Sequence, residues 1–320
     1  MRNYKLRTDL QRAVIGTFAL PLGIEPLNLP APNQGYTLEF HEGEDGEADG
    51  WSFHVVASHD RMVGLVREAF GLLPDEVSPI VEVGSRDAYR SMDIYLAQQP
   101  IPFEDFLDTW EAFEPVILED ASIGVGANAE LDDAFVEVFL DSWKGLLIHV
   151  PDEMKGQVER MLRRHSLREV EETWPDDIDE AGPPSQVREV LQIDDEESPD
   201  LDEVLLQLRE RWALELDVDP ETNVDDAGRS LGNTLWYGIA LCREATGHGG
   251  GAYITMWITA GSVAEVERLA AWRLKQEGRW SFQSFYTLDR VAFDERPEEL
   301  ADLPMRGRMP AVHLVFEEPW

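Results

Sequence analysis

The middle of the chain carries a dense run of negative charge. Between Glu169 and Glu203 there are 15 acidic residues and a single basic one, Arg188. Like charges at this density oppose compaction, and the prolines in the same stretch interrupt regular structure. The chain of 320 residues is also longer than one typical compact core. We predict two domains joined by an acidic linker: residues 1–171, the linker 172–200, and residues 201–320.

On either side of this stretch, one pattern of hydrophobic periodicity recurs. Two alternating segments, a segment with helical spacing and a further alternating segment follow one another in residues 36–85, 121–174 and 234–288. An extra helix is expected at 102–118, and a last strand at 311–320. The pattern predicts an α+β fold of repeated β-β-α-β units, with mainly antiparallel sheets and helices packed on one face.

One helix is predicted directly after the acidic stretch. Ser198 is a suitable N-cap and Pro199 suits the first turn. Leu201, Leu208 and Trp212 recur at helical spacing and form one apolar face. We expect this face to pack on the C-terminal domain.

Residues 228–251 contain two motifs found in esterases. GRSLG around Ser230 fits the Gly-x-Ser-x-Gly pattern of a nucleophile elbow, and HGGG at His248 fits an oxyanion-hole turn. An elbow needs a strand before it and a helix after it, but a polar segment precedes GRSLG and a predicted strand follows. Ser230 with His248 or His313 therefore gives only an alternative prediction of a hydrolase. The glycines are better explained by tight turns, at Gly228 and Gly232 and in a hairpin loop.

The predicted strand that follows these turns is bulky on both faces. Trp236 points to one side and Tyr237 to the other, because side chains alternate along a strand. One face is expected to join the core and the other to present aromatic groups for binding. The predicted binding residues are Trp236, Tyr237, His248, Gly249, Gly250 and Trp257.

An acidic loop near the N-terminus offers a further alternative. Glu44, Asp45, Glu47 and Asp49 could hold a calcium ion, although the spacing of an EF-hand is absent. Solvated acidic turns are the simpler explanation, so no metal site and no cofactor is predicted. The single cysteine, Cys242, excludes an intramolecular disulfide and a multi-cysteine zinc site, and a buried, inert thiol is expected.

The net charge of −37 limits the classes of partner. So acidic a surface repels phosphate backbones, which argues against nucleic-acid binding. No stretch reaches the ~18 apolar residues of a membrane span, and no signal-peptide cleavage site follows the apolar N-terminal segment. We expect a cytoplasmic, non-catalytic interaction or ligand-binding protein. The specific function that the charge favours is that of an inhibitor or immunity-type protein that neutralises a basic protein. The sequence does not indicate an oligomeric state.

Overall fold

The chain folds as a mixed α/β protein with mostly antiparallel sheets. The computed structural model describes residues 4–43, 48–131, 134–175, 183–193, 198–245, 250–304 and 309–319, which contain five α-helices. The chain divides into two compact units. Unit 1 comprises Met1–Val83 and Ile94–Asp217, and unit 2 comprises Gly84–Asp93 and Val218–Trp320.

Unit 1 is built on one large sheet. The strands of this sheet lie in the order β13-β7-β6-β9-β10-β11-β5-β4, and β8 pairs with β6. Their bounds are β4 Gly35–His41, β5 Gly50–Val56, β6 Glu76–Gly84, β7 Met92–Ala97, β8 Ile101–Pro102, β9 Ile123–Leu131, β10 Ala134–Leu140, β11 Leu146–Pro151 and β13 Leu214–Leu216. Two small sheets accompany it: β1 Val14–Ile15 with β2 Phe18–Ala19, and β3 Ile24–Pro26 with β12 Ser185–Val187.

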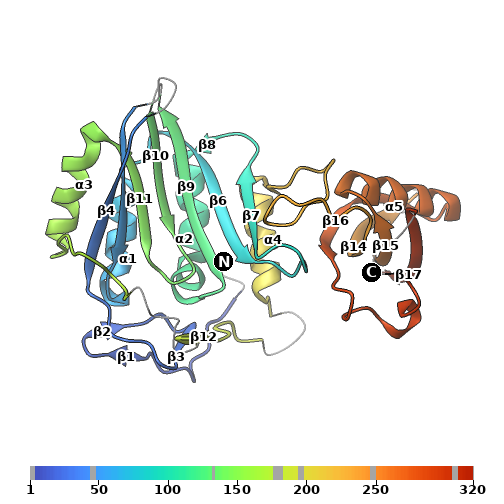
Figure 1. Cartoon of the computed structure of the whole chain (residues 1–320), viewed down its shortest axis with the longest axis horizontal. Helices are drawn as coiled ribbons and strands as arrows, with labels where there is room; N and C mark the ends of the chain where they lie inside the picture. Colours follow the sequence, from blue (N-terminus) through green and yellow to red (C-terminus); the bar gives the residue numbers. More distant parts are fainter. Residues whose placement is uncertain are drawn as a thin grey trace. The chain divides into compact units, whose positions relative to one another are not determined.

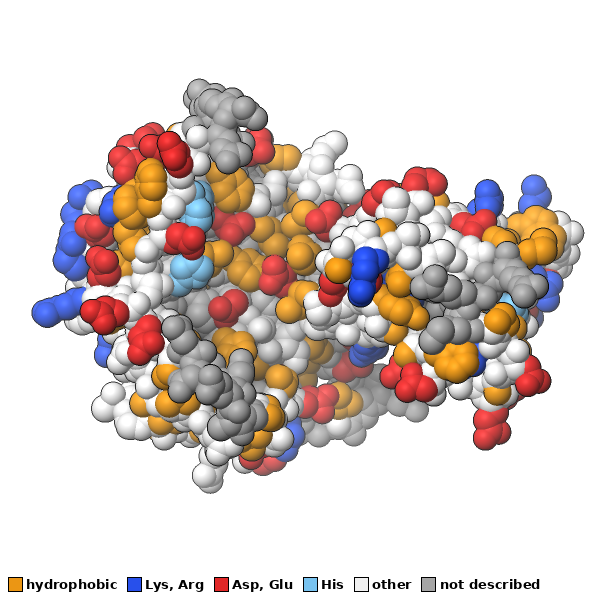
Figure 2. All heavy atoms as spheres, in the orientation of Figure 1, with side chains coloured by type: hydrophobic (Ala, Val, Ile, Leu, Met, Phe, Trp, Pro, Cys, Tyr) orange, Lys and Arg blue, Asp and Glu red, His pale blue; other side chains and the backbone are white. Residues whose placement is uncertain are grey.

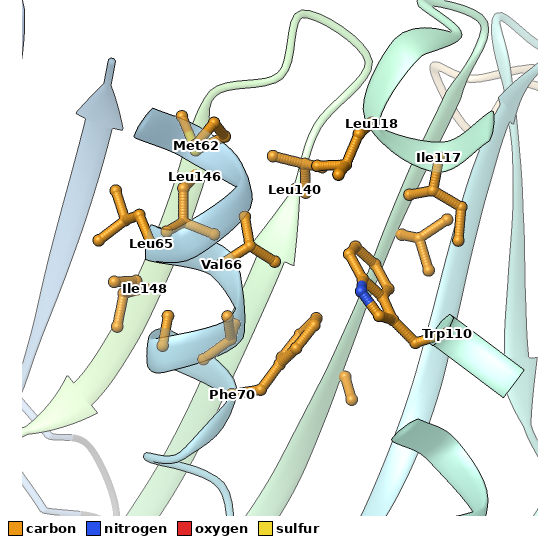
Figure 3. Close-up of a cluster of buried hydrophobic side chains, with 14 of the residues drawn as sticks. Met62, Leu65, Val66, Phe70, Trp110, Ile117, Leu118, Leu140, Leu146 and Ile148 are labelled. Carbon is orange, nitrogen blue, oxygen red and sulfur yellow. The ribbon is translucent and has the colours of Figure 1, made fainter. Parts of the chain in front are cut away.

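The helices of unit 1 share a single apolar core with one face of this sheet. They are α1 His59–Phe70, α2 Phe103–Glu119, α3 Asp152–Arg164 and α4 Leu201–Trp212. Helices α1 and α2 lie behind the sheet in the view of Figure 1. Figure 3 shows Leu65 and Phe70 of α1 and Trp110 of α2 gathered in one cluster with Leu140 and Leu146 of the sheet. All of these side chains are almost fully buried.

Helix α4 packs differently from the prediction. Val204, Leu208 and Trp212 are fully buried in the core of unit 1, and Trp212 stacks on Phe106 of α2 with 5.2 Å between ring centroids. The prediction that this helix packs on the C-terminal domain is therefore wrong. Its N-cap is also Asp200, which forms a capping box with Glu203, so Ser198 and Pro199 precede the helix.

The middle of the chain differs from the predicted linker and repeat. Residues 172–200 include strand β12, which pairs with β3, so part of this stretch belongs to the sheets of unit 1. The last alternating segment of the unit predicted at 121–174, residues 168–174, is not a strand but makes one isolated bridge, between Tyr36 and Glu169. Earlier in the second predicted unit, residues 134–151 form two strands, β10 and β11, joined by a turn.

Unit 2 is a four-stranded antiparallel sheet with a helix on one face. The order is β16-β14-β15-β17. The elements are β14 Thr234–Glu244, β15 Gly251–Ala260, α5 Val263–Glu277, β16 Trp280–Arg290, a 3-10 turn at Glu298–Leu300, and β17 Ala311–Pro319. Ser262 caps α5 and Gly278 ends it with φ of 73°.

A buried ion pair joins two segments of unit 2 that lie far apart in the sequence. Arg290, at the end of β16, donates to the carboxylate of Asp87 at 2.8 Å, and Asp87 belongs to the segment between β6 and β7. Arg290 also donates to Asn223 and to the carbonyl oxygen of Val224. Unit 2 therefore includes residues that a contiguous domain 201–320 would have left out.

Among the helices that the structure describes, none has the length and apolar character required to cross a bilayer.

Candidate functional site

One face of the large sheet in unit 1 is not covered by the helices of its core. Strand alternation directs Val136, Val138 and Leu140 of β10 into that core, so Glu137 and Phe139 point to the opposite face. The register places His149 of β11 beside Glu137. Figure 2 shows apolar, acidic and histidine side chains together over these strands.

A pocket of about 400 Å³ lies at the end of the sheet where β10 turns into β11. This volume is typical of small-molecule sites. Its walls come from β2, β5, β11, the turn between β10 and β11, and the segment after α3. The lining residues are Phe18, His54, Val55, Val56, Asp141, Trp143, Lys144, Gly145, Leu146, Leu147, Thr173 and Trp174.

The turn from Asp141 to Gly145 shapes the pocket wall. The amide of Gly145 donates to Asp141 Oδ1 at 2.8 Å, and the amide of Asp141 donates to the carbonyl of Gly145 at 3.0 Å. Lys144 has φ of 62°, a left-handed conformation that is uncommon for a residue with a Cβ. Its buried ammonium group donates to the carbonyl of Ile123 at 2.5 Å, which fixes the turn to the start of β9.

Burial dominates the electrostatics of this turn. Burial raises the pKa of the Asp141 carboxyl, against the opposing effect of the Gly145 amide and the Lys144 charge. Burial also lowers the pKa of Lys144 to about 8, although Asp120, Asp141 and Glu119 oppose this shift. The pKa of Glu82, on β6, is raised by burial and by the charge of Asp141. Asp141 is thus a carboxylate whose ionised form is not fully compensated by the protein.

Three aromatic rings form a corner of the pocket. Trp143 and Trp174 lie edge to face, with ring centroids 5.8 Å apart and planes at 74°. Phe18 lies edge to face with Trp174 at 5.7 Å. Trp143 keeps 39% of its surface exposed, so this corner is accessible from solvent. Rings and a carboxylate therefore line one cavity.

A second polar group lies on the same face of the sheet. Ser52 Oγ is 2.8 Å from His41 Nε2 and 3.0 Å from His149 Nδ1. Burial and the neighbouring His41 lower the pKa of His149. Ser52 therefore links His41 of β4 and His149 of β11 across the sheet, and these hydrogen bonds give the three side chains a structural role.

The predicted hydrolase residues do not meet in the part of the chain that the structure describes. Ser230 is exposed and makes an isolated bridge with Val224, and His313 Nε2 is 2.8 Å from Thr259 Oγ1. His248 lies outside the described residues. Gly228 and Gly232 have φ of 71° and 65°, which confirms the prediction of turns that need glycine. The strand β14 follows them, where an elbow would need a helix.

The predicted aromatic residues of unit 2 divide between the two faces of its sheet. Trp236 is buried under α5 and donates to the carbonyl of Ala260 at 3.0 Å. Tyr237 and Trp257 lie on the opposite face, with ring centroids 4.9 Å apart. In the β14–β15 hairpin, the carbonyl of Gly250 accepts from the amide of Glu244, while Gly249 lies outside the described residues with His248.

The metal alternative has no support from the described residues. Glu44, Asp45 and Glu47 lie outside them, and Asp49 accepts a hydrogen bond from the amide of Gly43. No group of three possible ligands occurs in the described ranges. Cys242 is fully buried, as predicted, and burial raises the pKa of its thiol to about 11.

The chain matches no protein-family model, no curated protein and no solved structure in the comparisons made with it.

None of the predicted catalytic, binding or metal-ligating residues lines this pocket. One local signal was present: Asp141 and Gly145 frame a segment, DSWKG, between two apolar alternating runs, which is a pattern typical of a hairpin turn. Trp174 carried no such signal, because its approach to Trp143 depends on the tertiary fold.

Proposed function

We propose that this protein is a non-catalytic ligand-binding protein and that its ligand enters the pocket of unit 1. The observation that carries this proposal is the pocket itself: about 400 Å³, bounded by the aromatic corner of Trp143, Trp174 and Phe18 and by the carboxylate of Asp141. Apolar walls with a small number of placed polar groups are the usual composition of a ligand site.

The polar groups of the pocket and of the hydrolase alternative favour binding over catalysis. Lys144, the amine in the lining, has its ammonium engaged with the carbonyl of Ile123. The hydrolase alternative has weaker support, because His313 is bonded to Thr259 and Ser230 is exposed at a turn. The ligand could also be part of a macromolecule, because the net charge of −37 favours a basic protein as partner. We place this interaction in the cytoplasm.

A fragment screen with a filled pocket tests this proposal. Fragments of all charges are screened by ligand-observed NMR against the wild type and Leu147→Trp, whose larger side chain occupies the cavity. The control is Phe293→Trp, which adds an indole at an exposed position of unit 2. We expect a set of fragments that bind the wild type and the control but not Leu147→Trp. Fragments that bind all three proteins equally would contradict the proposal.

A further inference from the structure

The chemistry of the pocket wall limits what the ligand can carry. Trp143 and Trp174 present two indoles at a steep angle, and Phe18 adds a third ring beside Trp174. The faces of aromatic rings are electron-rich and attract cations, indole most strongly. The exposed surface of Trp143 leaves this corner open to a ligand. The wall therefore suits a cation that also has apolar surface.

The carboxylate beside these rings has the complementary charge. Asp141 uses Oδ1 to accept the Gly145 amide, and it lines the cavity. The ammonium of Lys144, whose charge acts on Asp141, is buried and donates to the carbonyl of Ile123. The carboxylate of Asp120, which is also buried, interacts with the same ammonium group, so the charge of Lys144 is divided between Asp120 and Asp141. A cationic group on a ligand would thus supply the positive charge that the protein does not fully provide to the Asp141 carboxylate.

The site suits an organic cation and not a metal ion. Calcium and magnesium require several oxygen ligands, and the described residues contain no group of three candidate ligands. Indole rings supply no oxygen ligand to a metal ion, but they contact the carbon surface of an alkyl group. The net charge of −37 further raises the local concentration of any cation.

We propose that the ligand of this pocket carries an alkylguanidinium or alkylammonium group, paired with Asp141 and flanked by Trp143 and Trp174. This inference rests on the proposed function, because it names the chemical class of the ligand for the same pocket. A free amine or guanidine and an arginine or lysine side chain of a partner protein carry the same group.

Calorimetric titration with matched probes tests the inference. Butylguanidinium and butylammonium are the cationic probes, butylurea is the neutral isostere and butyrate is the anion. We expect the cations to bind the wild type and the neutral and anionic probes not to bind. Asp141→Asn should weaken cation binding by at least about tenfold, since it removes the paired charge. Trp143→Ala should weaken it as well, with butylguanidinium affected no less than butylammonium.

The matched control is Glu130→Gln, which removes one negative charge from an exposed position at the other end of β9. Its affinity for the cations should stay within about twofold of the wild type, because screening by salt reduces distant charge effects. Equal losses in Asp141→Asn and Glu130→Gln would overturn the inference, since binding would then follow net charge alone. Circular dichroism and the melting temperature of each variant show that the fold is retained.

The source of the group is decided by one further probe. N-acetyl-arginine-N-methylamide presents the arginine side chain with its peptide groups. Tighter binding than butylguanidinium indicates a peptide ligand, and weaker binding indicates a free small cation. Neutral fragments that bind the pocket while the cations do not would overturn this inference and leave the proposed function standing. If no probe or fragment of any charge distinguishes Leu147→Trp from the wild type, both fail.

Discussion

Two glycines of β9 illustrate how single residues set the shape of the uncovered sheet face. A Cβ at Gly124 would lie 2.8 Å from the Phe139 ring, and one at Gly126 would lie 2.3 Å from the carbonyl oxygen of Val138 and 2.6 Å from the Cα of Phe139. The Phe139 ring therefore lies directly over the backbone of β9, where any side chain would displace it.

Gly126→Ala should destabilise the protein, because the atoms in its way belong largely to backbone and cannot move aside cheaply. We expect a loss of about 2–3 kcal/mol in the free energy of unfolding, measured by urea titration. Gly84→Ala is the control, since no atom lies within 4 Å of its added Cβ. A loss of equal size in both variants would show that the close packing of Phe139 is not the cause.

Asp289 of β16 is a residue whose ionisation opposes folding. Burial, followed by the charges of Asp93 and Asp87, raises the pKa of Asp289 to about 6, although Arg90 and Arg86 oppose the shift. Because the folded-state pKa lies above the unfolded value, this group contributes stability at low pH. That contribution is lost as the pH rises through about 6.

Asp289→Asn should remove this dependence. At about pH 8 the variant should be more stable than the wild type, by on the order of 2 kcal/mol, because it carries no buried charge to ionise. The advantage should shrink as the pH falls from about 6 toward about 4. Urea unfolding across this range measures both proteins, and an advantage that grows as the pH falls would contradict the assignment.

At the scale of elements, the buried contacts of α4 assign this helix to unit 1. Its apolar face, including the fully buried Trp212, packs against α2 in unit 1. Trp212→Ala should therefore destabilise unit 1 by about 3–5 kcal/mol, the usual cost of deleting a large buried ring. Hydrogen exchange followed by mass spectrometry should show faster exchange in the sheet of unit 1 and unchanged protection in β14 and β15. Loss of protection only in unit 2 would contradict the observed packing.

The helices and strands were largely predictable because their periodicity is local. The helix expected at 102–118 is α2, and the segment of helical spacing expected within residues 234–288 is α5. The Ser262 side chain caps α5, and Gly278 ends it in a left-handed conformation that glycine adopts freely. The partner of an amphipathic face is not a local property. The face of α4 is equally apolar wherever it packs, which is why its assignment to the C-terminal domain was wrong.

The site was less predictable for the same reason. Glycine motifs at Gly228 and Gly232 are visible in the sequence, and the structure explains them as turns. The pocket, in contrast, is assembled from Phe18, Asp141 and Trp174, which lie far apart in sequence and meet only in the folded sheet. Pairing of such residues depends on strand order, which composition and periodicity do not specify.

At the scale of the whole molecule, unit 2 depends on a segment from the other half of the sequence. The carboxylate of Asp87 and the guanidinium of Arg290 are both buried, and 203 positions separate them. Breaking a buried pair by removing one partner leaves an uncompensated charge, which costs more than the pair itself contributes.

Asp87→Asn should therefore destabilise unit 2 by about 3–5 kcal/mol. Asp226→Asn is the control, since its carboxylate accepts from Ser91 at an exposed position. Urea unfolding followed by hydrogen exchange in β14–β16 measures the effect. Equal stability of Asp87→Asn and Asp226→Asn would mean that the buried pair does not hold this segment in unit 2.

The central claim, that the pocket of unit 1 binds a ligand, is tested most directly at its own tryptophans. The protein is labelled with 5-fluorotryptophan, and the ¹⁹F resonances of Trp143 and Trp174 are assigned from Trp143→Phe and Trp174→Phe. Titration with butylguanidinium should shift these two resonances in a saturable manner and leave that of Trp236, buried under α5 in unit 2, unchanged. Saturable shifts confined to tryptophans outside the pocket, or no saturable shift with any fragment found by the screen, would contradict the claim.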